Sequence, residues 1–181
     1  MNLKIMLAGS IPKGDDARKL WTDWKTDYKK ILSQLDNIEF VDGDAWKDET
    51  KPFLLFGHDL NLVKISDIVV VNAEKKIGKG IGVGTAQEIM VAKYFSRPVI
   101  TVLPQNTHHR RSDIVFDDTL ISDWISPFLL STSDLVVETI HDALPWIREY
   151  IENPKNKKIK NISIIDDAIS EYLKAYDNNK C

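Results

Sequence analysis

The chain has 181 residues, of which 43% are hydrophobic and 28% charged, with a formal net charge of −3. This length and composition predict one soluble domain with a short appendage, and the lack of a basic excess argues against a nucleic acid polymer as partner. The single cysteine, Cys181, excludes an internal disulfide, and the clustered ligands of a metal site are missing. The N-terminal apolar run is too short for a signal peptide, and no stretch approaches transmembrane length. We therefore expect a cytoplasmic protein with no membrane contact, no metal and no cofactor.

Short strands rich in Val and Ile alternate with helical patterns along the chain. Strands are predicted over 3–8, 38–41, 67–71, 98–103 and 135–137, and helices over 15–35, 52–65, 85–95 and from the last strand to about 150. Continuously apolar strands separated by helices predict a doubly wound, flavodoxin-like α/β fold: a parallel sheet of about five strands with helices on both faces. We expect one domain over 1–152. A linker and an amphipathic helix over 153–181 would pack either on that domain or on a neighbouring subunit.

The segment before the helix predicted over 85–95 combines a glycine turn with a carboxylate. Ligands of such sheets bind beyond the carboxyl ends of the strands, and this segment follows the third strand. Glycines there let the backbone approach a ligand, and the helix N-terminus attracts anions. The sequence is Gly82-Val83-Gly84-Thr85-Ala86-Gln87-Glu88. Thr85 and Glu88 also fit a capping box, which needs no function, and the two interpretations can coexist.

A second carboxylate, Asp59, lies in the helix predicted over 52–65. Helical spacing places it between Phe56 and Val63, on the face that meets the core or its rim. A carboxylate there costs free energy unless it is paired or functional, and a nearby backbone group could satisfy it. Two carboxylates near one cleft are what glycosidic cleavage requires, since one attacks the anomeric carbon and the other protonates the leaving group.

Two further loops carry candidate binding residues. Arg110 and Arg111, after the fourth strand, suit a phosphate, although a solvated loop that pairs with nearby aspartates (Asp113, Asp117 and Asp118) is the alternative. The adjacent His108 and His109 lack the helical spacing of metal ligands. Trp46, after the second strand, either stacks on a nucleobase or closes its loop over the core.

The run over 58–71, HDLNLVKISDIVVV, resembles the nucleoside 2-deoxyribosyltransferase-like family, which includes nucleotide N-glycosidases. Gly84 to Glu88, followed ten positions on by Pro98, is similar to the family's glycine turn and catalytic Glu. The opening Leu7-Ala8-Gly9-Ser10-Ile11 is similar to its first strand and sugar-facing loop.

The resemblance implies a catalytic domain over 1–152 that acts on a nucleoside or nucleoside 5′-monophosphate, by hydrolysis or by transfer to a second base. It implies that Glu88 attacks C1′ of the sugar and that Asp59 handles the proton of the departing base. The residues implied to line the sugar or 5′-phosphate are Gly9, Ser10, Gly82, Gly84 and Thr85.

The segment 131–134 resembles a family segment that a neighbouring subunit inserts into the active site. Ser133 and Asp134 are therefore candidate substrate-binding residues, and a homodimer or larger homo-oligomer is implied. Family members often carry a Tyr on the first strand, where its hydroxyl steadies the nucleophile, whereas Met6 stands here.

Two alternatives follow from these motifs. The Met6 departure favours a nucleotide-binding or sensing module without turnover. The G-x-G-T-x-x-E pattern also resembles nucleoside-monophosphate phosphoribohydrolases that release cytokinin-type bases. The missing P-G-G run and the D-L-N unit argue against that second alternative.

Overall fold

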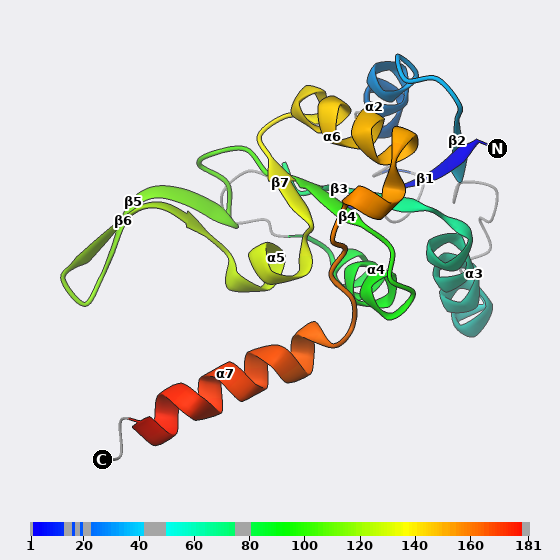
Figure 1. Cartoon of the computed structure of the whole chain (residues 1–181). Helices are drawn as coiled ribbons and strands as arrows, with labels where there is room; N and C mark the ends of the chain where they lie inside the picture. The colour runs from blue at the N-terminus through cyan, green and yellow to red at the C-terminus, as the bar shows by residue number, and fades with distance from the viewer. Residues whose placement is uncertain are drawn as a thin grey trace.

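The fold was obtained as a computed structural model that describes residues 2–12, 16, 19, 23–41, 50–74 and 81–178, the side chains of 176–178 excepted. Five parallel strands form the central sheet in the order β2-β1-β3-β4-β7 (Figure 1). Their bounds are β1 Leu3–Gly9, β2 Ile38–Val41, β3 Ile68–Asn72, β4 Val99–Val102 and β7 Leu135–Val137. The predicted doubly wound sheet is confirmed. Its central strand β3 is buried on both faces, as the continuous apolar run of its sequence predicts.

Helices cover both faces of this sheet. The helices α2 (Trp24–Leu32) and α6 (Ile140–Glu152) pack on one face, and α3 (Pro52–Ile65), α4 (Val83–Tyr94) and α5 (Pro127–Thr132) lie on the other (Figure 1). Alternate residues of β1 divide between the two cores, with Ile5 and Leu7 facing α2 and α6, and Met6 and Ala8 facing α3 and α4. No helix among the described residues is long and apolar enough to cross a membrane.

The helix predicted over 15–35 is wrong as a single element. Asp23 is the N-cap of α2: its carboxylate accepts the backbone N–H of Lys25 at 3.1 Å and the hydroxyl of Thr26 at 2.7 Å. Such a cap satisfies N–H groups that a helix start leaves open, so a new helix begins here. Asp16 and Lys19 are helical, and the rest of 13–22 lies outside the described residues.

The loop predicted after the fourth strand is also wrong. An antiparallel hairpin, β5 (Arg110–Phe116) and β6 (Thr119–Ile125), projects from the body there. Asp117 and Asp118 form its two-residue turn, both with positive φ (44° and 61°), which suits the right-handed twist of the paired strands.

After α6 the chain makes a short 3₁₀ turn, η2 (Pro154–Asn156), and ends its described part in α7 (Ile164–Asn178). Helix α7 projects away from the body of the domain (Figure 1).

Candidate active site

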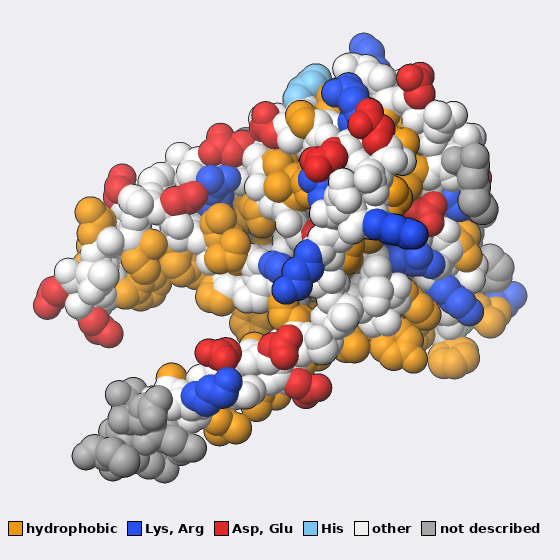
Figure 2. All heavy atoms as spheres, viewed as in Figure 1, with side chains coloured by type: hydrophobic (Ala, Val, Ile, Leu, Met, Phe, Trp, Pro, Cys, Tyr) orange, Lys and Arg blue, Asp and Glu red, His pale blue; other side chains and the backbone are white. Residues whose placement is uncertain are grey.

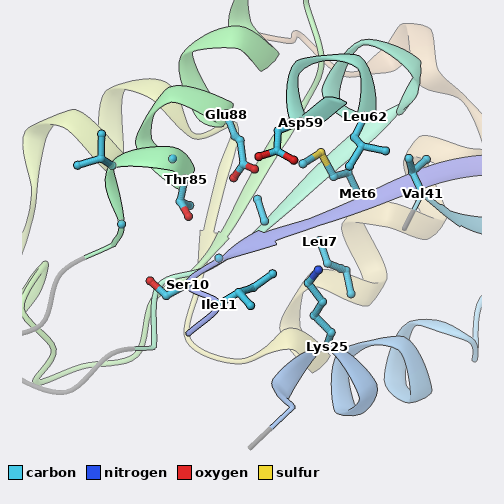
Figure 3. Close-up of a pocket in the computed structure, with 15 residues that line it drawn as sticks. Met6, Leu7, Ser10, Ile11, Lys25, Val41, Asp59, Leu62, Thr85 and Glu88 are labelled. Atoms are coloured by element: carbon cyan, nitrogen blue, oxygen red, sulfur yellow. The ribbon is translucent and has the colours of Figure 1, made fainter. Parts of the chain in front are cut away.

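A pocket of about 260 Å³ opens at the carboxyl ends of β1 and β2, between the N-terminal part of α4 and helix α3 (Figure 3). Parallel strands bring their following turns to the same edge, which is where ligands bind in doubly wound sheets. Seven of the predicted site residues line this pocket: Gly9, Ser10, Asp59, Gly82, Gly84, Thr85 and Glu88.

The two predicted catalytic carboxylates face the same space. Glu88 extends from α4 and Asp59 from α3, and their carboxylates point toward one another across the pocket (Figure 3). Glu88 is half-buried, and the side chain of Asp59 is 44% exposed. His58 Nδ1 lies 3.2 Å from Asp59 Oδ1, so the imidazole restricts the orientation of this carboxylate. The arrangement can therefore present one carboxylate to a sugar carbon and the other to its leaving group.

The capping-box interpretation of Thr85 and Glu88 is wrong. Helix α4 begins at Val83 with Gly82 as its N-cap, and that cap makes no side-chain hydrogen bond. Thr85 is thus the third residue inside the helix, and the register that a capping box requires is absent. The helix begins two residues before the threonine, which places Glu88 nearly two turns inside it.

The glycines of the site have different reasons for lacking a side chain. A Cβ on Gly9 would lie 2.6 Å from Cζ2 of Trp24, whose indole packs against the end of β1. The Trp24 indole also donates to the Ser10 carbonyl at 3.4 Å. A Cβ on Gly82 would lie 3.5 Å from Ser10 Oγ, so these two turns adjoin, whereas a Cβ on Gly84 would meet nothing within 4 Å. Gly9 therefore allows packing, and Gly84 leaves open the space at the helix N-terminus.

This difference gives a matched pair of variants. We expect Gly9→Ala to cost about 1–3 kcal/mol of stability by overpacking against Trp24, which lowers Tm by about 2–4 °C per kcal/mol in a chain of this size. We expect Gly84→Leu to leave Tm unchanged and to lower kcat/KM for the substrate by about tenfold or more, because its side chain would enter the ligand space. Thermal melts and steady-state kinetics check the pair. A destabilised Gly84→Leu with normal kinetics would contradict it.

Met6 is 4% exposed and lies on β1 beside Asp59 and Leu62, in the wall of the pocket (Figure 3). Its side chain supplies no hydroxyl to the pocket. Two other hydroxyls, those of Ser10 and Thr85, belong to residues that line the same pocket.

Sequence reasoning missed Lys25. This residue of α2 is 6% exposed, and it is the only cationic residue among the fifteen that line the pocket in the described part of the chain. Lys25, Tyr28 and Leu32 are the buried residues of α2 and recur at i, i+3 and i+7. That spacing is the signal that could have identified Lys25, since a lysine on a buried helical stripe needs a reason to be there.

The predicted phosphate-binding arginines lie outside this pocket. Arg110 binds both oxygens of Asp123, at 2.8 and 2.7 Å, donates to the Leu103 carbonyl at 3.1 Å, and lies 3.4 Å from Glu138. The hydrogen bond to Asp123 raises the pKa of Arg110 and lowers that of the Asp123 carboxyl. Arg111 is exposed on the hairpin. Arg110 is thus paired, though with other carboxylates than those nearest in sequence.

His109 connects the hairpin to the turn before α4. Its Nε2 accepts the backbone N–H of Ile81 at 3.1 Å, so this nitrogen carries no proton. Burial lowers the pKa of the His109 imidazole, in keeping with the neutral form.

Ser133 and Asp134 lie in the turn before β7, at the amino-terminal edge of the sheet and away from the pocket. Ser133 shares a 2.7 Å hydrogen bond with Thr101. Asp134 accepts the backbone N–H groups of Val99 and Lys160, each at 2.7 Å, and forms an ion pair with the fully buried Lys93. Burial lowers the pKa of Lys93. These buried side chains join β4, β7, α4 and the C-terminal linker, and within one copy of the chain they do not reach the pocket.

The buried pair predicts a large effect on stability. Asp134→Asn removes the charge that balances Lys93, and breaking a buried pair costs about 3–5 kcal/mol. Urea denaturation should show this loss, and the same change at Asp167, an exposed aspartate of α7, should cost under about 1 kcal/mol. A loss under about 1 kcal/mol for Asp134→Asn would contradict the role assigned to the pair.

Trp46, the remaining predicted substrate-binding position, lies outside the described residues. Among the described residues, no group of three or more His, Cys, Asp or Glu side chains is placed to hold a metal ion.

The solved structures that match this chain include the following three. A conserved protein from Enterococcus faecalis V583 matches with a TM-score of 0.54 at 19% identity, over 82% of this chain and 99% of that one. A 2-desoxiribosyltransferase from Leishmania mexicana matches with a TM-score of 0.52 at 10% identity, over 82% and 98%. The CMP N-glycosidase BcmB of Clostridium botulinum matches with a TM-score of 0.41 at 13% identity, over 80% and 97%. No protein-family model and no curated protein sequence matches the chain.

The first two of these matches agree with the fold class that the sheet topology defines. At these identities the likeness concerns the fold, which is an α/β fold resembling that of a deoxyribosyltransferase.

Proposed function

We propose that this protein cleaves or transfers the N-glycosidic bond of a nucleoside or nucleoside 5′-monophosphate. The observation that carries the proposal is the pair Glu88 and Asp59, which face one another across a pocket at the carboxyl edge of the sheet. Glycosidic cleavage through a covalent intermediate needs such a pair, one group as nucleophile and one as acid and base. The fold shared with a 2-desoxiribosyltransferase supports the same class of reaction.

In the proposed reaction a carboxylate oxygen of Glu88 attacks C1′ of the sugar. The bond between C1′ and the base nitrogen breaks, its electron pair stays on the base, and protonated Asp59 delivers a proton to the base. Asp59, now a carboxylate, takes a proton from the attacking water or second base as that nucleophile displaces Glu88 from C1′. Water yields hydrolysis, and a second base yields transfer.

The remaining lining residues support binding of the sugar part. Ser10 and Thr85 offer hydroxyls, and Lys25 offers a cation beside the turn that follows β1. We propose that these groups hold the sugar and any 5′-phosphate, and that Lys25 is a stronger candidate for the phosphate than Arg110 because Lys25 lines the pocket and Arg110 does not. We also propose that the protein works as a homo-oligomer on small-molecule substrates.

One specific observation favours a second candidate, a nucleotide-binding module without turnover. Met6 occupies the pocket wall where a supporting tyrosine hydroxyl is common in the resembled family. Such a module would bind nucleotides in the same pocket and release no base.

The test is incubation with purine and pyrimidine nucleosides, deoxynucleosides and their monophosphates, with and without a second free base. Chromatography for released or exchanged base is the readout, and Gln87→Ala, exposed on the same helix as Glu88, is the control variant. We expect base release from at least one substrate by wild type and by the control. Binding measured by calorimetry without release of any base would favour the binding module instead.

A further inference from the structure

The hairpin of β5 and β6 stands clear of the domain along its outer part and is joined to the domain at its base. Residues 115–120 at its far end are all exposed, and Figure 2 shows open space between the hairpin and α7. At the base, the His109 carbonyl accepts the backbone N–H of Ser126, the N-cap residue of α5, at 2.8 Å. Arg110 donates to the carbonyl of Leu103, directly after β4, at 3.1 Å. The backbone around His109 is therefore fixed to the end of β4 and to the start of α5.

The side chain of His109 reaches from this base to the turn that forms one wall of the pocket. Its Nε2 accepts the backbone N–H of Ile81 at 3.1 Å. The exposed His108 ring meets the His109 ring edge-on, with the two ring centroids 4.8 Å apart. The residue after Ile81 is Gly82, which begins α4 as its N-cap and lines the pocket together with Gly84. The hydrogen bond from His109 thus ends one residue before the pocket wall.

Two glycines leave this wall without side chains that could hold its backbone. Gly82 makes no side-chain hydrogen bond as the N-cap of α4, and a Cβ on Gly84 would meet nothing within 4 Å. Glycine also has the widest choice of backbone conformations. Ile81 packs its side chain against the core, and its N–H on His109 sets the orientation of the peptide group that leads into the glycines. Ile81 is therefore the point at which the turn is held.

We infer that His109 is a positioning residue of the active site, whose imidazole holds the turn before α4 in the conformation that receives the sugar of the substrate. This inference rests on the proposed function, and it gives the base of the hairpin a part in that function. His109 is not among the described residues that line the pocket, so it acts on the substrate through the turn. A ring nitrogen that accepts a hydrogen bond carries no proton, so the proton of the neutral ring lies on Nδ1.

Binding and catalysis should respond differently when this bond is lost. Helix α4 is held in the core by Ile89 and Ala92, which are 3% and 0% exposed, so Glu88 should keep its place. The turn at the helix start would sample more conformations, and binding would then have to select the competent one at a cost in affinity. The loss of one hydrogen bond corresponds to a change in affinity of about 3- to 10-fold. We therefore expect a higher KM with little change in kcat.

Steady-state kinetics on variants of the full chain test this role, with the nucleoside or nucleotide from which wild type releases base. His109→Leu cannot accept a hydrogen bond, and it should raise KM about 3- to 10-fold while kcat changes by less than about twofold. His109→Gln places an amide oxygen near the position of Nε2 and should restore KM to within about twofold of wild type. The same change at the exposed neighbour, His108→Gln, is the control and should leave both constants unchanged.

Two kinetic results would overturn the inference. A merely structural role for His109 would lower Tm in His109→Leu and leave the KM of the folded protein unchanged. A KM for His109→Gln as high as that for His109→Leu would show that the hydrogen-bond acceptor has no part in binding. In either case base release by wild type would leave the proposed function standing. A wild type that releases no base would instead contradict the proposed function, and with it the role that rests on it.

Nitrogen-15 NMR of the imidazole groups tests the bond itself, on wild type without substrate. The signals of His109 are identified by their loss in His109→Gln. We expect an unprotonated Nε2 and a protonated Nδ1 at about pH 7.5, as the hydrogen bond from Ile81 requires. A protonated Nε2 on His109 would overturn the inference, whether or not the protein releases base.

Discussion

Glu88→Ala is expected to lower kcat for base release by roughly 10³-fold or more, because it removes the nucleophile that forms the covalent intermediate. The fold should survive the change, since Glu88 is half-buried and belongs to no capping box in α4. Steady-state kinetics and a thermal melt, run beside Gln87→Ala, measure both effects. Full activity in Glu88→Ala would show that the nucleophile is another group.

Asp59→Asn should bind substrate nearly normally and turn it over about 10²–10⁴-fold more slowly, because an amide cannot deliver the proton that the departing base requires. Substrates whose base leaves without protonation should lose least. Kinetics over a series of leaving groups, with calorimetry for affinity, gives the two quantities separately. Asn61→Ala, exposed on the same helix, is the control and should behave as wild type.

Two results would speak against this role for Asp59. If Asp59→Asn abolishes binding or unfolds the protein, the carboxylate anchors the ligand or supports α3. If neither rate nor affinity changes, Asp59 has no part in the reaction, and the nucleotide-binding module becomes the better account.

The sheet could be predicted from the sequence because its strands are buried on both faces. The run Ile68–Val71 has no polar face, which is the pattern of a central parallel strand. The residue before the run, Asp67, accepts the backbone N–H of Lys4 in β1 at 2.8 Å. The start of α3 could also be predicted, because proline is favoured at the first position of a helix and Pro52 occupies that position.

Two predictions about the fold were wrong, the single helix over 15–35 and the loop after the fourth strand, and in both cases the role of an aspartate could not be read from the sequence. Asp23 lies within an apolar periodicity that continues on both sides of it, and only its side-chain bonds reveal that a new helix starts. The hairpin turns at Asp117 and Asp118 rather than at the more familiar Asn-Gly, so its turn signal was read as a charged loop.

The candidate site shows the same difference between features that short motifs predict and contacts between residues far apart in the sequence. The sequence could predict that Glu88, Asp59 and the glycine turn lie near one edge of the sheet, because each belongs to a local motif next to β3 in the chain, and they do line one pocket. The buried partner of Asp134 could not be predicted, because Lys93 is 41 residues away and reads as an ordinary last-turn lysine. The hairpin pairing of Arg110 with Asp123 depends on a strand register that no short motif specifies.

The central claim is a covalent bond between the sugar and Glu88, and mass spectrometry of acid-quenched reactions tests it directly. Trypsin cleaves after Lys79 and after Lys93, which releases residues 80–93 as one peptide that contains Glu88, while Asp59 falls in a different peptide. The account predicts that a substrate which releases base adds the mass of its sugar, or sugar phosphate, to the 80–93 peptide at early times, and that Glu88→Ala shows no such addition. Base release with an unmodified 80–93 peptide, or with the sugar on another peptide, would contradict it.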